Sequence, residues 1–276
     1  MRVKSILCLN WFFLSVGLIV CMGILLGLGI GITARVFEVK QDPRIELVID
    51  ALPGANCGGC GLAGCADLAK AIVAGKETAG KCPVCSSEGA SKISDILGAG
   101  TAKNIVKNKA VVLCGGDNKN AKSDAGYNGI NDCKSAVLVS SGAKGCKYGC
   151  LGLGSCTGAC PFNAIEITDD GLAVVHPELC VGCGKCVTAC PKNLIKLVPE
   201  TVKIHVFCSS PEKGPAKMKV CKVSCIGCRK CVKTAEKDQI LMKGFLAQVN
   251  YDAPPPPELA EASGCPTKCL RRTDRN

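Results

Sequence analysis

One run of cysteines constrains this chain more than any other feature. Two residues separate Cys180 from Cys183 and Cys183 from Cys186, and Cys190 follows after three more residues with Pro191 directly behind it. This spacing is typical of a [4Fe–4S] cubane, in which three thiolates of one loop bind the cluster and the fourth cysteine ligates a neighbouring cluster. Zinc ribbons use pairs of C-x2-C instead, and disulfide frameworks suit short secreted chains. The run therefore predicts iron–sulfur chemistry.

A partner run lies upstream of the first. Cys156 and Cys160 repeat its last two ligands, and a proline follows them. Leu153 stands where a regular run has a cysteine, but Cys150 and Cys146 precede it. Because the last cysteine of each run crosses to the other cluster, two sites are predicted. The upstream site has the ligands Cys146, Cys150, Cys156 and Cys190, and the downstream site has Cys160, Cys180, Cys183 and Cys186.

Short apolar stretches accompany these two runs, at 164–167, 171–175 and 193–197. Each has the length and the β-branched content of a strand, and the first two read as a hairpin. Together with the cysteines they predict a two-cluster ferredoxin of the bacterial type over residues 141–200.

The ferredoxin pattern recurs after a shift of 75 residues, which places Cys156 on Cys231 and Cys190 on Cys265. The ligands of the downstream site map onto non-ligating residues, so one complete ligand set is absent from the second copy. Those residues are Ala235, Pro255, Glu258 and Glu261. The second copy is predicted to keep one cubane, with the ligands Cys225, Cys228, Cys231 and Cys265.

A further cysteine group precedes the ferredoxins, with the spacing Cys57-x2-Cys60-x4-Cys65-x16-Cys82. It lies between apolar helical patterns, in a segment whose many glycines let the chain fold closely around a bound group. Four thiolates on one loop and one helix predict a single further cubane. Zinc is the alternative occupant here, because this spacing is less diagnostic than a ferredoxin run.

The N-terminal segment carries no charge from residue 6 to residue 34. This uncharged segment is longer than the stretch of about 20 apolar residues that spans a bilayer, and it is too long for the apolar region of a signal peptide. We therefore expect a retained single-pass anchor. The basic residues on its two sides do not decide its orientation. Cluster thiolates need a reducing compartment, so residues 35–276 are expected in the cytoplasm.

The charge and the histidine content exclude several functions. The formal net charge of +11 counts every cysteine as neutral, and bound cubanes are anionic, so no nucleic-acid partner is predicted. Two histidines in the whole chain leave no basis for a His triad or a His-rich zinc site. No phosphate loop or dinucleotide fingerprint follows a strand pattern, so we expect no independent catalytic site and no NAD site on this chain.

The order of these parts resembles a known family. The apolar segment, the stretch Leu52-Pro53-Gly54-Ala55-Asn56-Cys57-Gly58-Gly59-Cys60-Gly61 and the adjacent ferredoxin resemble the RnfB family, which supplies one component of the Rnf ion-translocating ferredoxin:NAD oxidoreductase complex. The resemblance implies an iron–sulfur electron-transfer subunit of a translocase that pumps Na⁺ or H⁺. Its partners would be the other subunits of the complex and soluble ferredoxin as electron donor, and its location the bacterial inner membrane. The missing ligands of the last repeat depart from the family's long members, which carry a second two-cluster ferredoxin.

The expected fold is α+β, with one transmembrane helix, a small Cys-rich 4Fe–4S module, ferredoxin-like repeats and about four [4Fe–4S] clusters. The predicted boundaries are 1–34 for the anchor, 35–98 for the 4Fe–4S module, 99–140 for a connecting segment, 141–200 for the two-cluster ferredoxin and 201–276 for the degenerate repeat. Two alternative functions stay open: the polyferredoxin subunit of another membrane hydrogenase or reductase, and a zinc-binding structural or nucleic-acid adaptor. Unassigned cysteines, either structural thiols or ligands of one further cluster, are Cys85, Cys114, Cys133, Cys208, Cys221 and Cys269.

Overall fold

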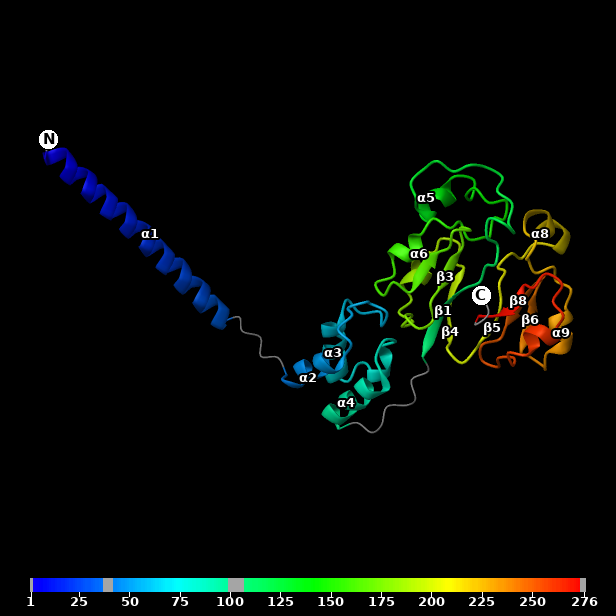
Figure 1. Cartoon of the computed structure of the whole chain (residues 1–276). Helices are drawn as coiled ribbons and strands as arrows, with labels where there is room; N and C mark the ends of the chain where they lie inside the picture. The colour runs from blue at the N-terminus through cyan, green and yellow to red at the C-terminus, as the bar shows by residue number, and fades with distance from the viewer. Residues whose placement is uncertain (1, 37–41, 99–106, 274–276) are drawn as a thin grey trace. The chain divides into compact units, whose positions relative to one another are not determined.

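A computed structural model of the chain describes residues 2–36, 42–98 and 107–273 (Figure 1). The chain divides into two units, Met1–Pro43 and Arg44–Asn276. The first unit contains one helix, α1 (Arg2–Val36). Its segment Val16–Thr33 has a mean hydropathy of 2.4 and is long and apolar enough to cross a membrane. The predicted apolar helix is therefore present.

The second unit begins with a small helical module. It consists of α2 (Arg44–Ala51), α3 (Cys65–Val73), the 3-10 turn η1 (Ala79–Lys81) and α4 (Ser87–Leu97). Val48, Leu68 and Ile93 are buried together between the three α-helices because each helix has one apolar face. Helix α4 begins where the Ser86 hydroxyl accepts a hydrogen bond from the Gly89 amide at 3.0 Å. The apolar core holds both ends of the cysteine-rich loop.

The first ferredoxin unit is built on two antiparallel strand pairs. Strands β2 (Ile165–Ile167) and β3 (Ala173–Val175) form the predicted hairpin. Strand β4 (Ile195–Pro199) pairs with β1 (Asn108–Val112), with Val112 opposite Ile195. Three short helices complete this unit: α5 (Cys133–Leu138), α6 (Ser155–Gly158) and α7 (Lys185–Ala189).

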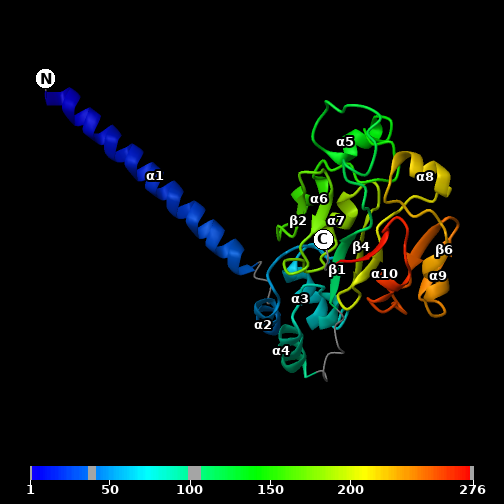
Figure 2. The same cartoon turned by 45° about the vertical axis from the view of Figure 1, so that its right-hand side comes forward.

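The second ferredoxin unit likewise contains two antiparallel strand pairs, and its helices and strands lie together at the right of Figure 2. An outer pair joins β5 (Ile204–Val206) to β8 (Leu270–Arg272), and an inner hairpin joins β6 (Ile240–Lys243) to β7 (Leu246–Val249). Its helices are α8 (Gly214–Val220), α9 (Lys230–Thr234) and α10 (Leu259–Ala262). The α+β fold and the internal repeat expected from the cysteine spacing are thus confirmed.

The first ferredoxin unit also uses residues that lie outside its predicted range of 141–200. Strand β1 and helix α5 fall in the segment 99–140, which was expected only to connect two domains. Strand β1 is buried at Ala110 and Val112, in the same core as the cysteines of this unit. The pairing of β1 with a strand more than 80 residues away depends on tertiary packing, which cysteine spacing does not report.

Candidate iron–sulfur centres

The glycine-rich module gathers its four predicted cysteines. Cys57 and Cys82 are buried, and Cys60 and Cys65 are half-buried and pack against the core that contains Cys82. The loop is held to α3 by the Asn56 side chain, whose oxygen accepts a hydrogen bond from the Cys65 amide at 2.8 Å. Burial raises the pKa of Cys82, and the nearby Cys57 and Cys65 raise it further. Cys57, Cys65 and Cys82 therefore lie close enough to influence one another.

Cys85 is buried next to this group, and burial also raises the pKa of its thiol. The nearby thiols of Cys82 and Cys65 raise the pKa of Cys85 further. Cys85 therefore belongs to the wall of the same site, and no separate cysteine group forms around it in the part of the chain that the structure describes.

The four cysteines predicted for the downstream ferredoxin site lie together. They line one cavity of about 10 Å³: Cys160, Cys180, Cys183 and Cys186. The Ala110 amide donates a hydrogen bond to Sγ of Cys180 at 3.3 Å, and the Ala164 amide donates one to Sγ of Cys160 at 3.4 Å. Burial raises the pKa of Cys186 to about 12, with further contributions from the other three thiols. Backbone N–H groups aimed at sulfur stabilise bound thiolates and tune a cluster's potential.

The upstream ferredoxin site has an unexpected member. The pKa of Cys156 is raised to about 11 by burial and by the nearby thiols of Cys150, Cys133 and Cys190. Cys133 begins helix α5, and its amide donates a hydrogen bond to the Ser155 hydroxyl at 2.7 Å. The structure therefore brings Cys133 together with three of the predicted ligands.

Cys146, the fourth predicted ligand of that site, lies elsewhere. It lines a different cavity, which also contains Cys114, Cys208 and Cys221. Its predicted grouping with Cys150, Cys156 and Cys190 is therefore not the grouping of the side chains. Cys133 was missed because its position, 17 residues before Cys150, matches no ligand spacing.

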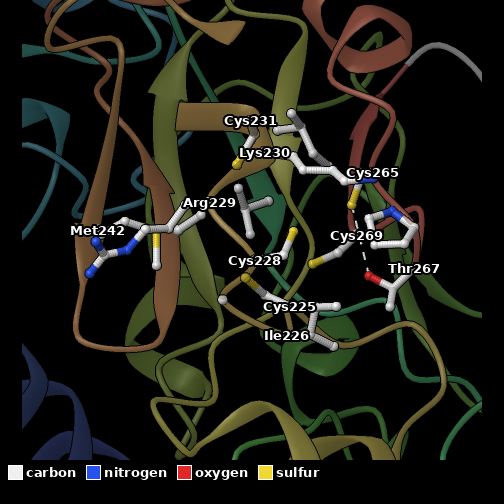
Figure 3. Close-up of a pocket in the computed structure, with 15 residues that line it drawn as sticks. Cys225, Ile226, Cys228, Arg229, Lys230, Cys231, Met242, Cys265, Thr267 and Cys269 are labelled. Carbon is white, nitrogen blue, oxygen red and sulfur yellow. Dashed lines mark hydrogen bonds between the residues drawn. The ribbon is translucent and has the colours of Figure 1, made fainter. Parts of the chain in front are cut away.

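The second copy gathers its four predicted cysteines around a cavity of about 20 Å³, which Cys269 also lines. Figure 3 shows the sulfur atoms of Cys225, Cys228, Cys231, Cys265 and Cys269 turned toward one space. A hydrogen bond with the Cys269 thiol lowers the pKa of Cys225 to about 5, although burial acts in the opposite direction. The same interaction raises the pKa of Cys269 well above its usual value.

The ligand set that the second copy lacks is replaced by apolar packing. Ala235 stands where the first copy has Cys160, and it packs in the same core as the buried Leu259 of α10. The backbone is nevertheless retained. Asn163, three residues after Cys160, has a φ of 50°, and Asp238, three residues after Ala235, has a φ of 66°. The loop keeps its left-handed turn after the loss of its ligand.

The donor set fits cubanes better than it fits zinc or disulfides. All the cysteines that the structure describes are free thiols. Within the described residues, no three Cys, His, Asp or Glu side chains converge tightly enough for a single metal ion. Tetrahedral zinc needs sulfur atoms about 3.8 Å apart, from Zn–S bonds of about 2.3 Å, whereas a cubane spreads its four ligands around a larger body.

Comparisons with known proteins agree with this chemistry. Residues 52–84 match a family model of an Fe-S cluster domain, and residues 173–196 match the 4Fe-4S binding domain.

Three curated relatives, all B subunits of ion-translocating complexes, are similar over most of the chain. The one from the Na(+)-translocating ferredoxin:NAD(+) oxidoreductase complex of Acetobacterium woodii is 44% identical over 88% of this chain and 73% of its own length. The one from the ion-translocating oxidoreductase complex of Methanosarcina acetivorans is 39% identical over 86% of this chain and 90% of its own. The one from the proton-translocating ferredoxin:NAD(+) oxidoreductase complex of Clostridium ljungdahlii is 40% identical over 83% of this chain and 81% of its own length. With its cysteine-rich module and ferredoxin repeats, this chain therefore belongs to the RnfB family, the B subunits of the ion-translocating (Rnf) oxidoreductase complexes.

Proposed function

We propose that this chain relays single electrons inside a membrane-bound ion-translocating ferredoxin:NAD oxidoreductase. Reduced ferredoxin is the donor, and the membrane and NAD-linked subunits of the complex accept the electrons, while Na⁺ or H⁺ is pumped. A bound [4Fe–4S] cluster supplies reversible one-electron chemistry. The observation that carries this proposal is the shared core of the first ferredoxin unit, which contains cysteines of both of its sites, Cys156 and Cys186 among them.

We assign four cluster sites to this relay. The upstream ferredoxin site takes Cys133 in place of Cys146, because Cys133 is the thiol that lies beside Cys150 and Cys156. The four ligand sets are Cys57, Cys60, Cys65 and Cys82; Cys133, Cys150, Cys156 and Cys190; Cys160, Cys180, Cys183 and Cys186; and Cys225, Cys228, Cys231 and Cys265.

The close approach between the glycine-rich module and the first ferredoxin unit supports a continuous route. A Cβ on Gly59 would lie only 2.7 Å from the carbonyl oxygen of Cys183 and 3.0 Å from the Pro83 side chain. Cys57 also lies near enough to Cys183 to contribute to the raised pKa of that thiol, which burial chiefly causes. Two cluster loops therefore meet backbone to backbone, with no intervening side chain at Gly59.

The anchor and the thiols support the proposed location. Helix α1 has the length and the apolarity of a membrane span. Thiolate ligands are retained in a reducing compartment, so the cysteine-rich unit would face the cytoplasm of a bacterial cell. Chemistry on NAD would belong to other subunits, since this sequence carries no dinucleotide fingerprint.

Anaerobic reduction of the full-length chain tests this proposal. The chain is purified in detergent and loaded with iron and sulfide. It is then mixed with reduced ferredoxin while the broad cluster absorption at about 400 nm is followed. We expect bleaching to the level that dithionite reaches, and no bleaching with oxidised ferredoxin. If dithionite bleaches the chain but reduced ferredoxin does not, the chain is a redox protein with another electron donor, and the ferredoxin assignment is contradicted. A colourless chain that retains stoichiometric zinc would contradict electron transfer altogether.

A further inference from the structure

A cavity between the two ferredoxin units is lined by four cysteines that no predicted cluster uses together. These cysteines are Cys114, Cys146, Cys208 and Cys221. Cys114 and Cys221 are buried, and Cys146 and Cys208 are half-buried. The cavity volume is about 20 Å³, the same as at the cysteine site of the second copy. The cavity therefore has four thiol donors and resembles in volume the site predicted to hold a cluster in the second copy.

Hydrogen bonds between the two units hold the walls of this cavity in place. The Gly115 amide donates to the Phe207 carbonyl at 3.0 Å, and the Ser209 hydroxyl donates to the Leu113 carbonyl at 2.9 Å. Ala121 also forms an antiparallel bridge with Cys221. These contacts lie at or next to Cys114, Cys208 and Cys221, so the packing of both units positions these three thiols.

The four cysteines form two equivalent pairs, one from each ferredoxin unit. Cys114 lies two residues after the outer strand β1, and Cys208 lies two residues after the corresponding strand β5. Cys146 precedes Cys150 by four residues, as Cys221 precedes Cys225. Matching contributions from two repeats are the arrangement expected of a group shared between them, whereas structural thiols would not need to recur in pairs.

The backbone leaves the space between two of these sulfur atoms free. A Cβ on Gly116 would lie 3.3 Å from Sγ of Cys221 and 3.8 Å from Sγ of Cys114. A Cβ on Gly149 would lie 3.6 Å from Sγ of Cys146. Both glycines line the cavity, and neither has a positive φ. Their lack of a side chain keeps the interior open and is not required by the turn geometry.

Two buried lysines place positive charge around the cavity without a carboxylate partner. The Lys217 ammonium donates to the carbonyls of Ser210 and Phe245, at 3.1 and 3.0 Å. The Lys144 ammonium donates to the Gly116 carbonyl at 2.9 Å. Lysine is almost never buried unless it is paired, yet neither side chain forms an ion pair among the residues that the structure describes. An anionic group in the cavity would provide the missing counter-charge.

We propose that Cys114, Cys146, Cys208 and Cys221 bind a fifth [4Fe–4S] cluster, shared by the two ferredoxin units. On binding, the four thiols would release their protons and coordinate iron as thiolates, and the cluster would supply negative charge near the buried lysines. The site would also transfer electrons between the two ferredoxin units. Cys114 accepts a hydrogen bond from the Cys150 amide of the upstream site at 3.4 Å, and Cys208 is joined through the Cys269 thiol to Cys225. It thereby connects the second copy to the first.

Iron and sulfide analysis of the full-length chain tests the site. After anaerobic reconstitution, we expect about 20 iron and about 20 sulfide per chain, four of each per cubane. Cys114→Ala and Cys221→Ala should each lose about four iron, one cluster's content. The double variant should also lose about four, because both residues hold the same cluster. Cys21→Ala, which removes an exposed cysteine of α1, is the matched control and should retain the full iron content.

A spin count on the fully reduced wild-type chain gives a second measurement that needs no variant. Five paramagnetic clusters per chain are expected. About 16 iron and four spins in the wild type would overturn the proposal. So would a double variant that loses about eight iron, because the two cysteines would then serve different clusters. Either result would leave the electron-relay function intact if reduced ferredoxin still bleaches the chain.

Discussion

The backbone amide of Cys150 donates a hydrogen bond to Sγ of Cys114 over 3.4 Å. Cys150 belongs to the upstream ferredoxin site, and Cys114 to the cavity between the two ferredoxin units. If both cysteines bind clusters as proposed, this contact would give an electron a short covalent and hydrogen-bonded route between the two sites. It would also make the potential of each site sensitive to the other, since N–H groups directed at sulfur influence cluster potentials.

Cys133 and Cys146 are assigned to different clusters, and this assignment predicts additive losses of iron. Cys133→Ala should remove the upstream ferredoxin cluster, and Cys146→Ala should remove the cluster of the shared cavity. Each variant should lose about four iron and the double variant about eight, because the two cysteines line different sites. Iron analysis with circular dichroism to verify folding makes the measurement. If the double variant loses only about four iron, both cysteines bind the same cluster and the assignment to two sites is wrong.

The degenerate half of the second copy predicts a contrast between two neighbouring substitutions. Cys265→Ser should remove one cluster, because Cys265 lines the cysteine cavity of that unit. Glu258→Gln should leave the iron content unchanged, because Ala235 and Leu259 fill the place of the absent ligand set with apolar packing. Iron analysis of both variants after identical reconstitution is the measurement. Loss of iron in Glu258→Gln would mean that a carboxylate replaces a cysteine as ligand.

The buried ammonium of Lys217 should raise the reduction potential of its neighbours. Lys217→Met removes a positive charge from a buried position, and the extra negative charge of a reduced cluster is then less well stabilised. We expect the potential of the affected cluster to fall by on the order of 60 mV, the equivalent of about 1.4 kcal/mol for one electron. Redox titration followed by paramagnetic resonance measures the shift. Lys219→Met, on the exposed face of the same helix α8, is the control and should shift it little; equal shifts in both variants would argue against a role for burial.

The contact at Gly59 predicts slower electron exchange without loss of clusters. In Gly59→Ala the new methyl group would meet the Cys183 carbonyl oxygen at 2.7 Å, so the two loops must separate. Iron content should stay at the wild-type value, while redistribution of electrons after partial flash reduction should slow. Gly158→Ala is the control, because a Cβ there meets nothing within 4 Å. Unchanged kinetics in Gly59→Ala would place the main route elsewhere.

The proposed membrane topology predicts protection from external protease. If α1 spans the membrane with residues 35–276 on the cytoplasmic side, protease added to spheroplasts should leave the cysteine-rich region intact. Digestion should begin only after the membrane is permeabilised with detergent. Fragmentation of the ferredoxin repeats in sealed spheroplasts would reverse the assigned orientation.

The cysteine spacing was sufficient to predict the local parts of the candidate sites. Ligands on one loop are separated by a few residues, and the same backbone turns recur wherever that spacing recurs. Gly154, Gly184 and Arg229, each two residues before a cysteine, have φ values of 80°, 80° and 61°. The repeat comparison likewise predicted the absent ligand set of the second copy. Local spacing was informative there because a cubane loop is a short-range structure.

Groupings that join distant segments could be established only from the tertiary structure. Cys133 reaches the upstream site through the contact of its amide with Ser155, and Cys146 is directed to the shared cavity beside Cys221. Strand β1 brings Cys114 to the same place by pairing with β4. The sequence by itself determined the chemistry, the repeats and the anchor-like helix, because these depend on residue type and short spacing. Which thiols share a site depends on strand pairing and burial across the two ferredoxin units, and only the packed fold decides those.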